Sequence, residues 1–226
     1  MTRTLPAWLA IPFCLFSLSV QADTRLTAGL TSNEIWRGLS QSDNELSPFV
    51  GLDVGAETDP YLGAWAGKVD FGDGNSTGLD FYSGWYFARE SFEFDAGFYN
   101  YAYPGSVYDD SDQVDAYLAF IGGAVTVGWE HTLWGQAGQD APYTAGDDYV
   151  FASYTHQLEE NWSVKLTAGY YRFDEDEVVW GNNDFGQLRL DLKYREFSIG
   201  ISGAGSGSGN SDTLILAAWT WSVDLP

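Results

Sequence analysis

Side-chain catalysis in this chain would have to use His131 and His156, because the sequence contains no other histidine. A hydrolytic site requires a nucleophile, a base and an orienting group within reach of one another. Neither histidine lies beside a recognisable serine motif, and a histidine at a membrane interface explains each of them more simply. The sequence therefore predicts no catalytic residues and no enzyme.

The single cysteine, Cys14, lies in a segment that differs in composition from the rest of the chain. Residues 1–22 carry one charge, Arg3, followed by an apolar stretch and a small-residue site that ends at Ala22. These features are typical of a secretory signal peptide, so we expect cleavage after Ala22. The mature chain, residues 23–226, would then have no thiol for a disulfide, a zinc site or catalysis, and we expect it to form one domain.

Carboxylates are the commonest charged groups, with 32 Asp and Glu against ten Lys and Arg. The longer connections between the predicted strands contain many of them and no Lys or Arg. We expect an external acidic rim made of Asp109, Asp110, Asp112, Asp147, Asp148, Asp174, Glu175, Asp176 and Glu177. A rim of one sign would concentrate cations at a pore mouth. The alternative is a solvated surface that shares divalent ions with lipopolysaccharide phosphates.

Two acidic runs, residues 109–112 and 174–177, contain oxygen ligands of the kind that Ca²⁺ prefers. Neither run has the spacing of an EF-hand loop, so loose counterion binding is the favoured interpretation. The sequence predicts no specific metal site and no cofactor. The strong negative charge also argues against nucleic acid as a partner.

A second set of charged residues alternates with apolar residues along the predicted strands, and so should face the inside of a barrel. These pore-lining candidates are Asp53, Asp80, Glu93, Asp95, Lys165, Arg189, Asp191, Lys193 and Arg195. The early candidates are acidic and most of the later ones are basic, so opposite walls could carry opposite charge and influence ion selectivity. The alternative is that these charges pair across a narrow lumen and close it.

The elements that must position these residues are strands, because the dominant period from Asp23 onward is two. Residues 162–170 and 187–195 alternate apolar and polar most clearly, as strands with two different faces do. We predict about twelve strands, near residues 24–37, 46–57, 60–70, 77–88, 91–103, 113–121, 124–134, 149–158, 161–172, 185–195, 196–203 and 213–223. The apolar stretch 116–129 has Gly122-Gly123 at its middle, which favours two strands and a tight turn over a helix.

The connections between these strands alternate in length. Tight turns are expected around residues 58–59, 89–90, 122–123, 159–160 and 195–196, and longer loops between them. Short periplasmic turns and long external loops are typical of an outer-membrane barrel. This pattern places both termini in the periplasm and predicts an all-β fold, a transmembrane antiparallel up-and-down β-barrel.

A soluble β-sandwich would also alternate, but there the apolar faces cover each other. The predicted export signal and the alternating connections favour the barrel. So do aromatic residues near strand ends, which would form interfacial girdles. They are Trp36, Tyr61, Trp85, Tyr86, Trp162, Tyr170, Trp180, Tyr194 and Trp221.

Two stretches resemble the opening of a known family. Residues 30–42 read LTSNEIWRGLSQS and residues 63–71 read GAWAGKVDF, and the likeness continues through residues 79–85 and 98–104. The pattern is similar to that of the TorF-like porins of proteobacteria, also called the Gcw_chp family. The resemblance implies an outer-membrane barrel of channel type, and it implies no substrate or catalytic residue.

The sequence thus predicts an outer-membrane porin-like channel for passive diffusion of small cationic or neutral solutes. Its expected partners are outer-membrane lipid, lipopolysaccharide, the barrel assembly machinery and the solutes. A non-conducting barrel with a structural or surface-binding role is the alternative, and a lipid-modifying barrel enzyme is the third possibility.

Overall fold

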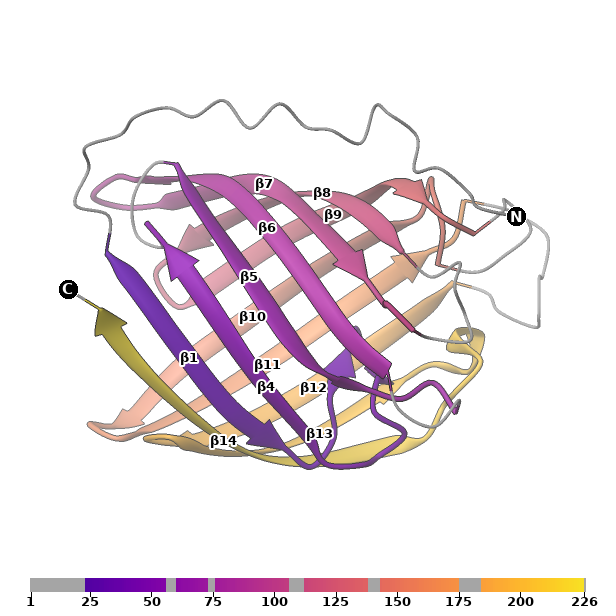
Figure 1. Ribbon diagram of the computed structural model, residues 1–226. Coiled ribbons are helices and arrows are strands. Elements are labelled where there is room, and N and C mark those ends of the chain that lie inside the picture. Colours follow the sequence, from indigo (N-terminus) through magenta and orange to yellow (C-terminus); the bar gives the residue numbers. More distant parts are fainter. Residues whose placement is uncertain are drawn as a thin grey trace.

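Twelve strands form a closed antiparallel barrel in the computed structural model (Figure 1). The structure describes residues 23–55, 60–72, 76–105, 112–137, 143–174 and 184–225, so the predicted signal segment and the turn at 58–59 lie outside the described residues. The barrel strands are β1 (Thr24–Thr31), β4 (Ser47–Val54), β5 (Tyr61–Val69), β6 (Ser76–Ala88), β7 (Glu93–Ala102), β8 (Gln113–Gly122), β9 (Val125–Gly135), β10 (Asp148–Glu159), β11 (Trp162–Arg172), β12 (Phe185–Tyr194), β13 (Phe197–Ala204) and β14 (Thr213–Leu225).

Each barrel strand pairs with the next barrel strand along the chain, and β1 closes the ring by pairing with β14. In that closing pair Thr24 lies opposite Leu225 and Thr31 opposite Ala218. The predicted number of strands is therefore confirmed, as is the turn that separates β8 from β9. Gly123 makes that turn with a φ of 58°, a left-handed conformation that suits a tight hairpin.

The alternating apolar side chains lie on the outside of the barrel. Leu188 and Leu190 of β12 are 57% and 44% exposed, and Phe197 and Ile199 of β13 are each 58% exposed. Large apolar side chains stay exposed to this extent all around the ring, where a sandwich would have covered them with a second sheet. The fold is therefore a transmembrane β-barrel with an apolar outer face.

The ring has two different ends. The short turns among the described residues lie at one end, called here the turn end, together with the paired strand ends Thr24 and Leu225. The strand ends that lead into the six longer connections lie at the other, called here the loop end. Among the described residues no helix is long and apolar enough to cross a membrane, and the one helical segment is the 3₁₀ turn Ser206–Ser208.

The first predicted strand, residues 24–37, was too long. β1 ends at Thr31, and the chain then leaves the barrel wall and forms a separate two-stranded hairpin from β2 (Ile35–Trp36) and β3 (Leu39–Ser40). Three of the predicted girdle residues face the inside of the barrel, and Trp180 lies outside the described residues. Tyr86 lies between the exposed Trp85 and Phe87 and opposite the inward-facing Asp95. Trp36 lies on this hairpin, and the Tyr61 hydroxyl donates a hydrogen bond to Asp95 on the inner wall. Trp85, Trp162, Tyr170, Tyr194 and Trp221 are exposed on the outer face.

Candidate pore and its inserted hairpin

The first long connection, residues 32–46, is folded into the barrel and is called here the inserted hairpin. Its tip is a tight turn in which Arg37 and Gly38 have φ values of 46° and 89°. Positive φ at both central residues is what a two-residue hairpin turn of this hand requires. A side chain at Gly38 would also collide with Gln187 of β12, because an added Cβ would lie 2.9 Å from the Gln187 Oε1 atom.

Hydrogen bonds hold the base of the inserted hairpin in place. The Asn33 side chain is buried, accepts a hydrogen bond from the Ser40 hydroxyl (2.7 Å) and donates one to the Asn44 Oδ1 atom (2.8 Å). The Gln41 amide donates to the Glu34 carbonyl (2.7 Å), and the Asp70 amide donates to the Gln41 carbonyl (2.7 Å). The hairpin is therefore tied both to itself and to the end of β5.

Arg37 fixes the tip of the hairpin to the inner wall. Its Nη2 atom donates a 2.6 Å hydrogen bond to Asp115 of β8 and also contacts Glu130 of β9. The guanidinium lies 4.1 Å from the ring centre of Trp36 and 4.9 Å from that of Tyr149, distances at which cation–π attraction is favourable. Burial alone would lower the pKa of Arg37, but Glu130 and Asp115 outweigh it and raise that pKa well above its usual range.

Apolar contacts hold the opposite side of the hairpin. Ile35 packs on Leu214 and Leu216, two inward-facing residues of β14. In the ring order β14 and β8 are separated by five strands on either side, so they lie opposite each other. Because Ile35 contacts β14 and Arg37 contacts β8, the inserted hairpin crosses the lumen.

The pore-lining candidates of the early strands lie on the inner wall, where tyrosines bind several of them. Tyr82 donates a hydrogen bond to Asp53, and Asp95 accepts hydrogen bonds from the hydroxyls of Tyr61 (2.7 Å) and Tyr117 (3.1 Å). Asp80 of β6 and Glu93 of β7 also lie on the inner wall. The next residue on each strand, Phe81 and Phe94 respectively, is exposed on the outer face.

The later candidates form a mixed-charge row on β11 and β12. Arg189 pairs with Asp191 at 2.9 Å, and Lys165 lies directly opposite Asp191 in the strand register. Lys193 continues the inward row. Arg195 departs from the prediction, because it lies in the turn after β12 with a φ of 52° and its guanidinium stands over the Tyr194 ring. β6 and β12 are opposite in the ring, so Asp80 and Arg189 lie on facing walls.

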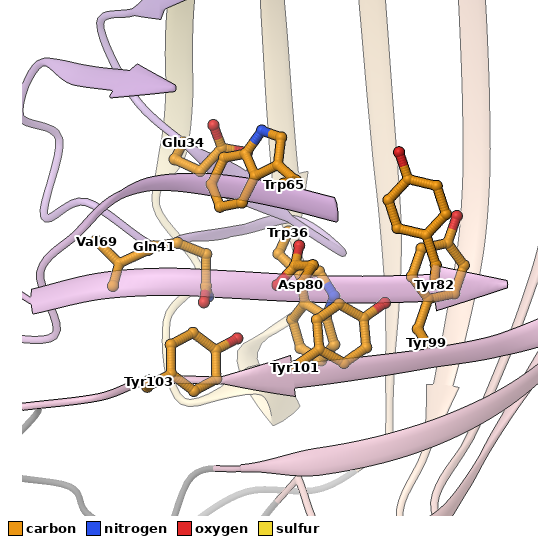
Figure 2. A pocket seen from close by; sticks show the side chains of 10 residues that line it. All are labelled: Glu34, Trp36, Gln41, Trp65, Val69, Asp80, Tyr82, Tyr99, Tyr101 and Tyr103. Atoms are coloured by element: carbon orange, nitrogen blue, oxygen red, sulfur yellow. The ribbon is translucent and has the colours of Figure 1, made fainter. Parts of the chain in front are cut away.

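A cavity of about 300 Å³ lies between the inserted hairpin and the wall formed by β5, β6 and β7 (Figure 2). It is lined by Glu34, Trp36, Gln41, Trp65, Val69, Asp80, Tyr82, Tyr99, Tyr101 and Tyr103. Glu34 precedes β2 and lies outside the barrel strands. Burial raises its pKa to about 7, although the positive charge of Arg189 opposes the shift.

The described members of the predicted rim that precede Asp174 accept hydrogen bonds from neighbouring groups. Asp147 is buried and accepts hydrogen bonds from Tyr171 (2.8 Å) and from the backbone amides of Thr144 and Asp174. Burial raises the pKa of Asp147, and these bonds oppose that change. Asp112 accepts a bond from the Tyr103 amide at 2.8 Å.

Asp148 also has a basic partner, which lies outside its own loop. Arg172, at the end of β11, donates to it from Nε at 3.1 Å and from a second nitrogen, and Trp129 and His131 contact it at 2.9 Å. Asp174 is exposed at the end of the described stretch. The remaining predicted rim members, Asp109, Asp110, Glu175, Asp176 and Glu177, lie outside the described residues.

Sequence reasoning missed Glu34 and Arg37, the two charged residues that the hairpin carries into the lumen. Both were assigned to the first strand. The adjacent apolar pair Ile35-Trp36, followed by Arg37-Gly38, breaks the period of two and could have indicated a turn there. Within the described residues no group of three His, Cys, Asp or Glu side chains could hold a metal ion.

A closed ring of twelve antiparallel strands, apolar outside and polar inside, defines the class as a transmembrane β-barrel. The profile of a family described as "Bacterial protein of unknown function (Gcw_chp)" matches residues 22–207, and the chain belongs to this family. The family pattern in residues 30–42 thus coincides with the end of β1 and the inserted hairpin. A comparison with curated protein sequences found no match.

Solved structures share the fold at low sequence identity. The KdgM porin superposes with a TM-score of 0.56 at 6% identity, over 90% of this chain and 99% of its own. The KdgM porin in complex with disordered oligogalacturonate gives 0.55 at 6% identity, with the same shares covered. A structure from a study of in-meso crystallization of membrane proteins gives 0.56 at 10% identity, over 90% of this chain and 83% of its own. At these identities the similarity concerns the fold.

Proposed function

We propose that this protein is an outer-membrane channel for passive diffusion of small cationic or neutral solutes. The observation that carries the proposal is a lumen lined by charged and tyrosine side chains, with a cavity of about 300 Å³ beside the hairpin that crosses it. Polar interiors under an apolar outer band are typical of channel-forming barrels. The hairpin narrows the passage, which favours small solutes.

A preference for cations follows from the charges that the lumen retains. Arg37 is neutralised by Asp115 and Glu130, and Arg189 by Asp191. Asp80 and Glu34 have no ion-pair or hydrogen-bond partner among the described side chains. The inner wall also carries Asp53, Glu93 and Asp95 against Lys165 and Lys193, so the described acidic groups are in excess. Rings of fixed negative charge favour cations in narrow pores.

The channel proposal is tested by conductance of the purified, refolded protein in planar bilayers under a KCl gradient. We expect discrete openings and a reversal potential that indicates K⁺ over Cl⁻. A folded barrel that runs faster on a gel before boiling, yet shows no openings, would refute the channel.

A non-conducting barrel with a structural or surface-binding role is the second candidate, and one observation favours it. The hairpin crosses the lumen and is fixed on both sides, by Arg37 at β8 and by Ile35 at β14. No observation favours the third possibility, a lipid-modifying enzyme. His131 stacks on Trp129 and His156 on Tyr154, both on the outer face.

The proposal also places the termini in the periplasm and the loop end outside the cell, with lipopolysaccharide and the barrel assembly machinery as partners. An epitope inserted between residues 109 and 110 should then be detected on intact cells. An epitope at residues 160–161, in the turn between β10 and β11, should be detected only after lysis. The reverse result would mean that the barrel is inserted the other way round.

A further inference from the structure

The cavity beside the inserted hairpin contains two carboxylates that come from different elements. Glu34 enters it from the segment before β2, and Asp80 enters it from β6 (Figure 2). In the part of the chain that the structure describes, neither carboxylate has a hydrogen bond or an ion pair. Removing a carboxylate from bulk water without a partner costs free energy, so a bound cation would stabilise both carboxylates.

The basic residues nearest to the cavity are already engaged. Arg37 pairs with Asp115 and Glu130, and it lies between the Trp36 and Tyr149 rings. Arg189 pairs with Asp191 on the facing wall. Neither guanidinium makes an ion pair with Glu34 or Asp80 in the described structure, so the cavity keeps a negative charge that the protein does not cancel.

Aromatic rings supply most of the remaining lining. Tyr99 and Tyr101 are stacked with ring centres 5.7 Å apart, and Trp36 meets Tyr101 edge-on at 6.2 Å. Trp65 and Tyr82 line the same cavity from β5 and β6. Aromatic faces attract cations, and cages of such rings bind quaternary ammonium groups in particular.

We propose that this cavity binds a small alkylated ammonium cation, with its charge toward Glu34 and Asp80 and its methyl groups on the aromatic rings. The inference rests on the proposed function, because a solute must enter the lumen to reach the cavity. A volume of about 300 Å³ is at the lower limit of pockets for small molecules, which suits a ligand of this size.

Other ligand classes fit the lining less well. Ca²⁺ requires six to eight oxygen ligands, and Mg²⁺ an octahedral set, whereas the cavity offers two carboxylates and the amide of Gln41. A neutral sugar could stack on the rings but would leave both carboxylates without a counter-charge. An anion would be repelled by them.

The experiment is a titration of the detergent-purified barrel with choline at pH 8, in which binding is measured by calorimetry and by tryptophan fluorescence. The control ligand is 3,3-dimethyl-1-butanol, which has the shape of choline but no charge. We expect saturable choline binding at least about tenfold tighter than binding of the neutral alcohol, a difference within the range of a desolvated cation–π contact. Glucose is titrated in parallel.

Matched variants locate the site. Asp80→Asn should weaken choline binding about tenfold or more, whereas Glu93→Gln, which changes an inner-wall carboxylate at the first residue of β7 and outside the cavity, should not. Trp65→Phe keeps an aromatic ring and should weaken binding less than Trp65→Leu. Mobility on unboiled gels checks that each variant is folded.

Binding should also depend on pH, because a cation favours the ionised form of Glu34. With the pKa of Glu34 near 7 in the free protein, affinity should rise about tenfold between pH 6 and pH 8, and Glu34→Gln should reduce this dependence. Asp80 faces the same cavity, so its carboxylate contributes to the same pH dependence of binding. The lining tyrosines ordinarily ionise near pH 10, above this range. The basic group whose charge acts on Glu34 is the guanidinium of Arg189.

Equal binding of choline and the neutral alcohol, binding of glucose instead, or no effect of Asp80→Asn would each overturn the inference. These outcomes are separate from the channel test. Conductance without choline binding would refute only the cation site, and choline binding without conductance would refute only the channel.

Discussion

Arg37 is the residue on which the inserted hairpin depends most directly. Its side chain is 5% exposed and that of Asp115 is fully buried. Removing one member of a buried ion pair leaves the other charge without compensation, which typically costs about 3–5 kcal/mol. The Nε atom of Arg37 and one oxygen of Asp115 already lack hydrogen-bond partners in the described structure. No neighbouring group would therefore replace a hydrogen bond that a substitution removes.

Arg37→Ala should therefore release the hairpin tip. We expect a lower temperature for loss of the fast-migrating gel band and a larger single-channel conductance. Arg37→Lys should rescue only part of the effect, because a lysine cannot reproduce a guanidinium that contacts two carboxylates and stacks on a ring. The matched control is Arg172→Ala, which removes an exposed arginine from Asp148 on the outer face and should leave the conductance unchanged. Unchanged conductance in Arg37→Ala would show that the tip does not restrict the pore.

Glu34 gives a second prediction, about pH. A carboxyl group whose pKa rises from 4.5 to about 7 on folding binds more protons in the folded state between these values, so its contribution becomes less favourable as pH increases through that window. Glu34→Gln should consequently stabilise the barrel at pH 8, by at most about 3 kcal/mol, and have little effect at pH 4. Thermal unfolding at the two pH values checks this. Equal stabilisation at both would mean that the ionisation of Glu34 is not responsible.

The alternation in the sequence identified Asp53, Asp80 and Asp95 as inner-wall positions, because period two fixes which face a strand residue occupies. It could not assign Glu34 or Arg37, since their positions depend on a tight turn and on partners that lie far away along the chain. Nor could it show that Asp148 would meet Arg172, because that contact depends on the register between β10 and β11.

At the scale of elements, the sequence predicted the strands well because each has one lipid-facing and one lumen-facing side. β4 to β14 begin and end within a few residues of the predicted segments. The first strand is the exception, and the physical reason is local. Asn33 forms side-chain hydrogen bonds with Ser40 and Asn44 that compete with continuation of the β1 ladder.

The inserted hairpin is the element expected to limit the conductance. Replacing residues 34–41 with a glycine-serine segment of equal length removes the side chains that contact β14 and β8, and should increase single-channel conductance several-fold. The same replacement at residues 206–211, which follow β13 at the loop end, should not. If both loops have equal effects, the restriction lies at the mouth of the pore and not at the hairpin.

At the scale of the whole molecule, the distribution of charge determines what the barrel admits. The chain has a net charge of −22, but charges near the lumen act most strongly, since exposed charges are screened over about 8 Å at physiological ionic strength. The described rim residues Asp147 and Asp148 are held by hydrogen bonds or by Arg172. Selectivity should therefore depend more on lumen carboxylates than the sequence alone suggested.

A comparison of variants decides between rim and lumen. Asp80→Asn should reduce the preference for K⁺ over Cl⁻ at both low and high salt, because a partly buried charge is screened less than an exposed one. Changing residues 174–177 together to Asn and Gln should reduce the preference mainly at low salt. Changing Arg189 and Lys193 to Gln should increase the preference for K⁺, since this removes positive charge and leaves Asp191 without the Arg189 partner.

The measurement is the reversal potential in KCl gradients of low and high mean concentration. Anion preference in the unmodified channel, or a preference unaffected by Asp80→Asn, would contradict control by the lumen carboxylates.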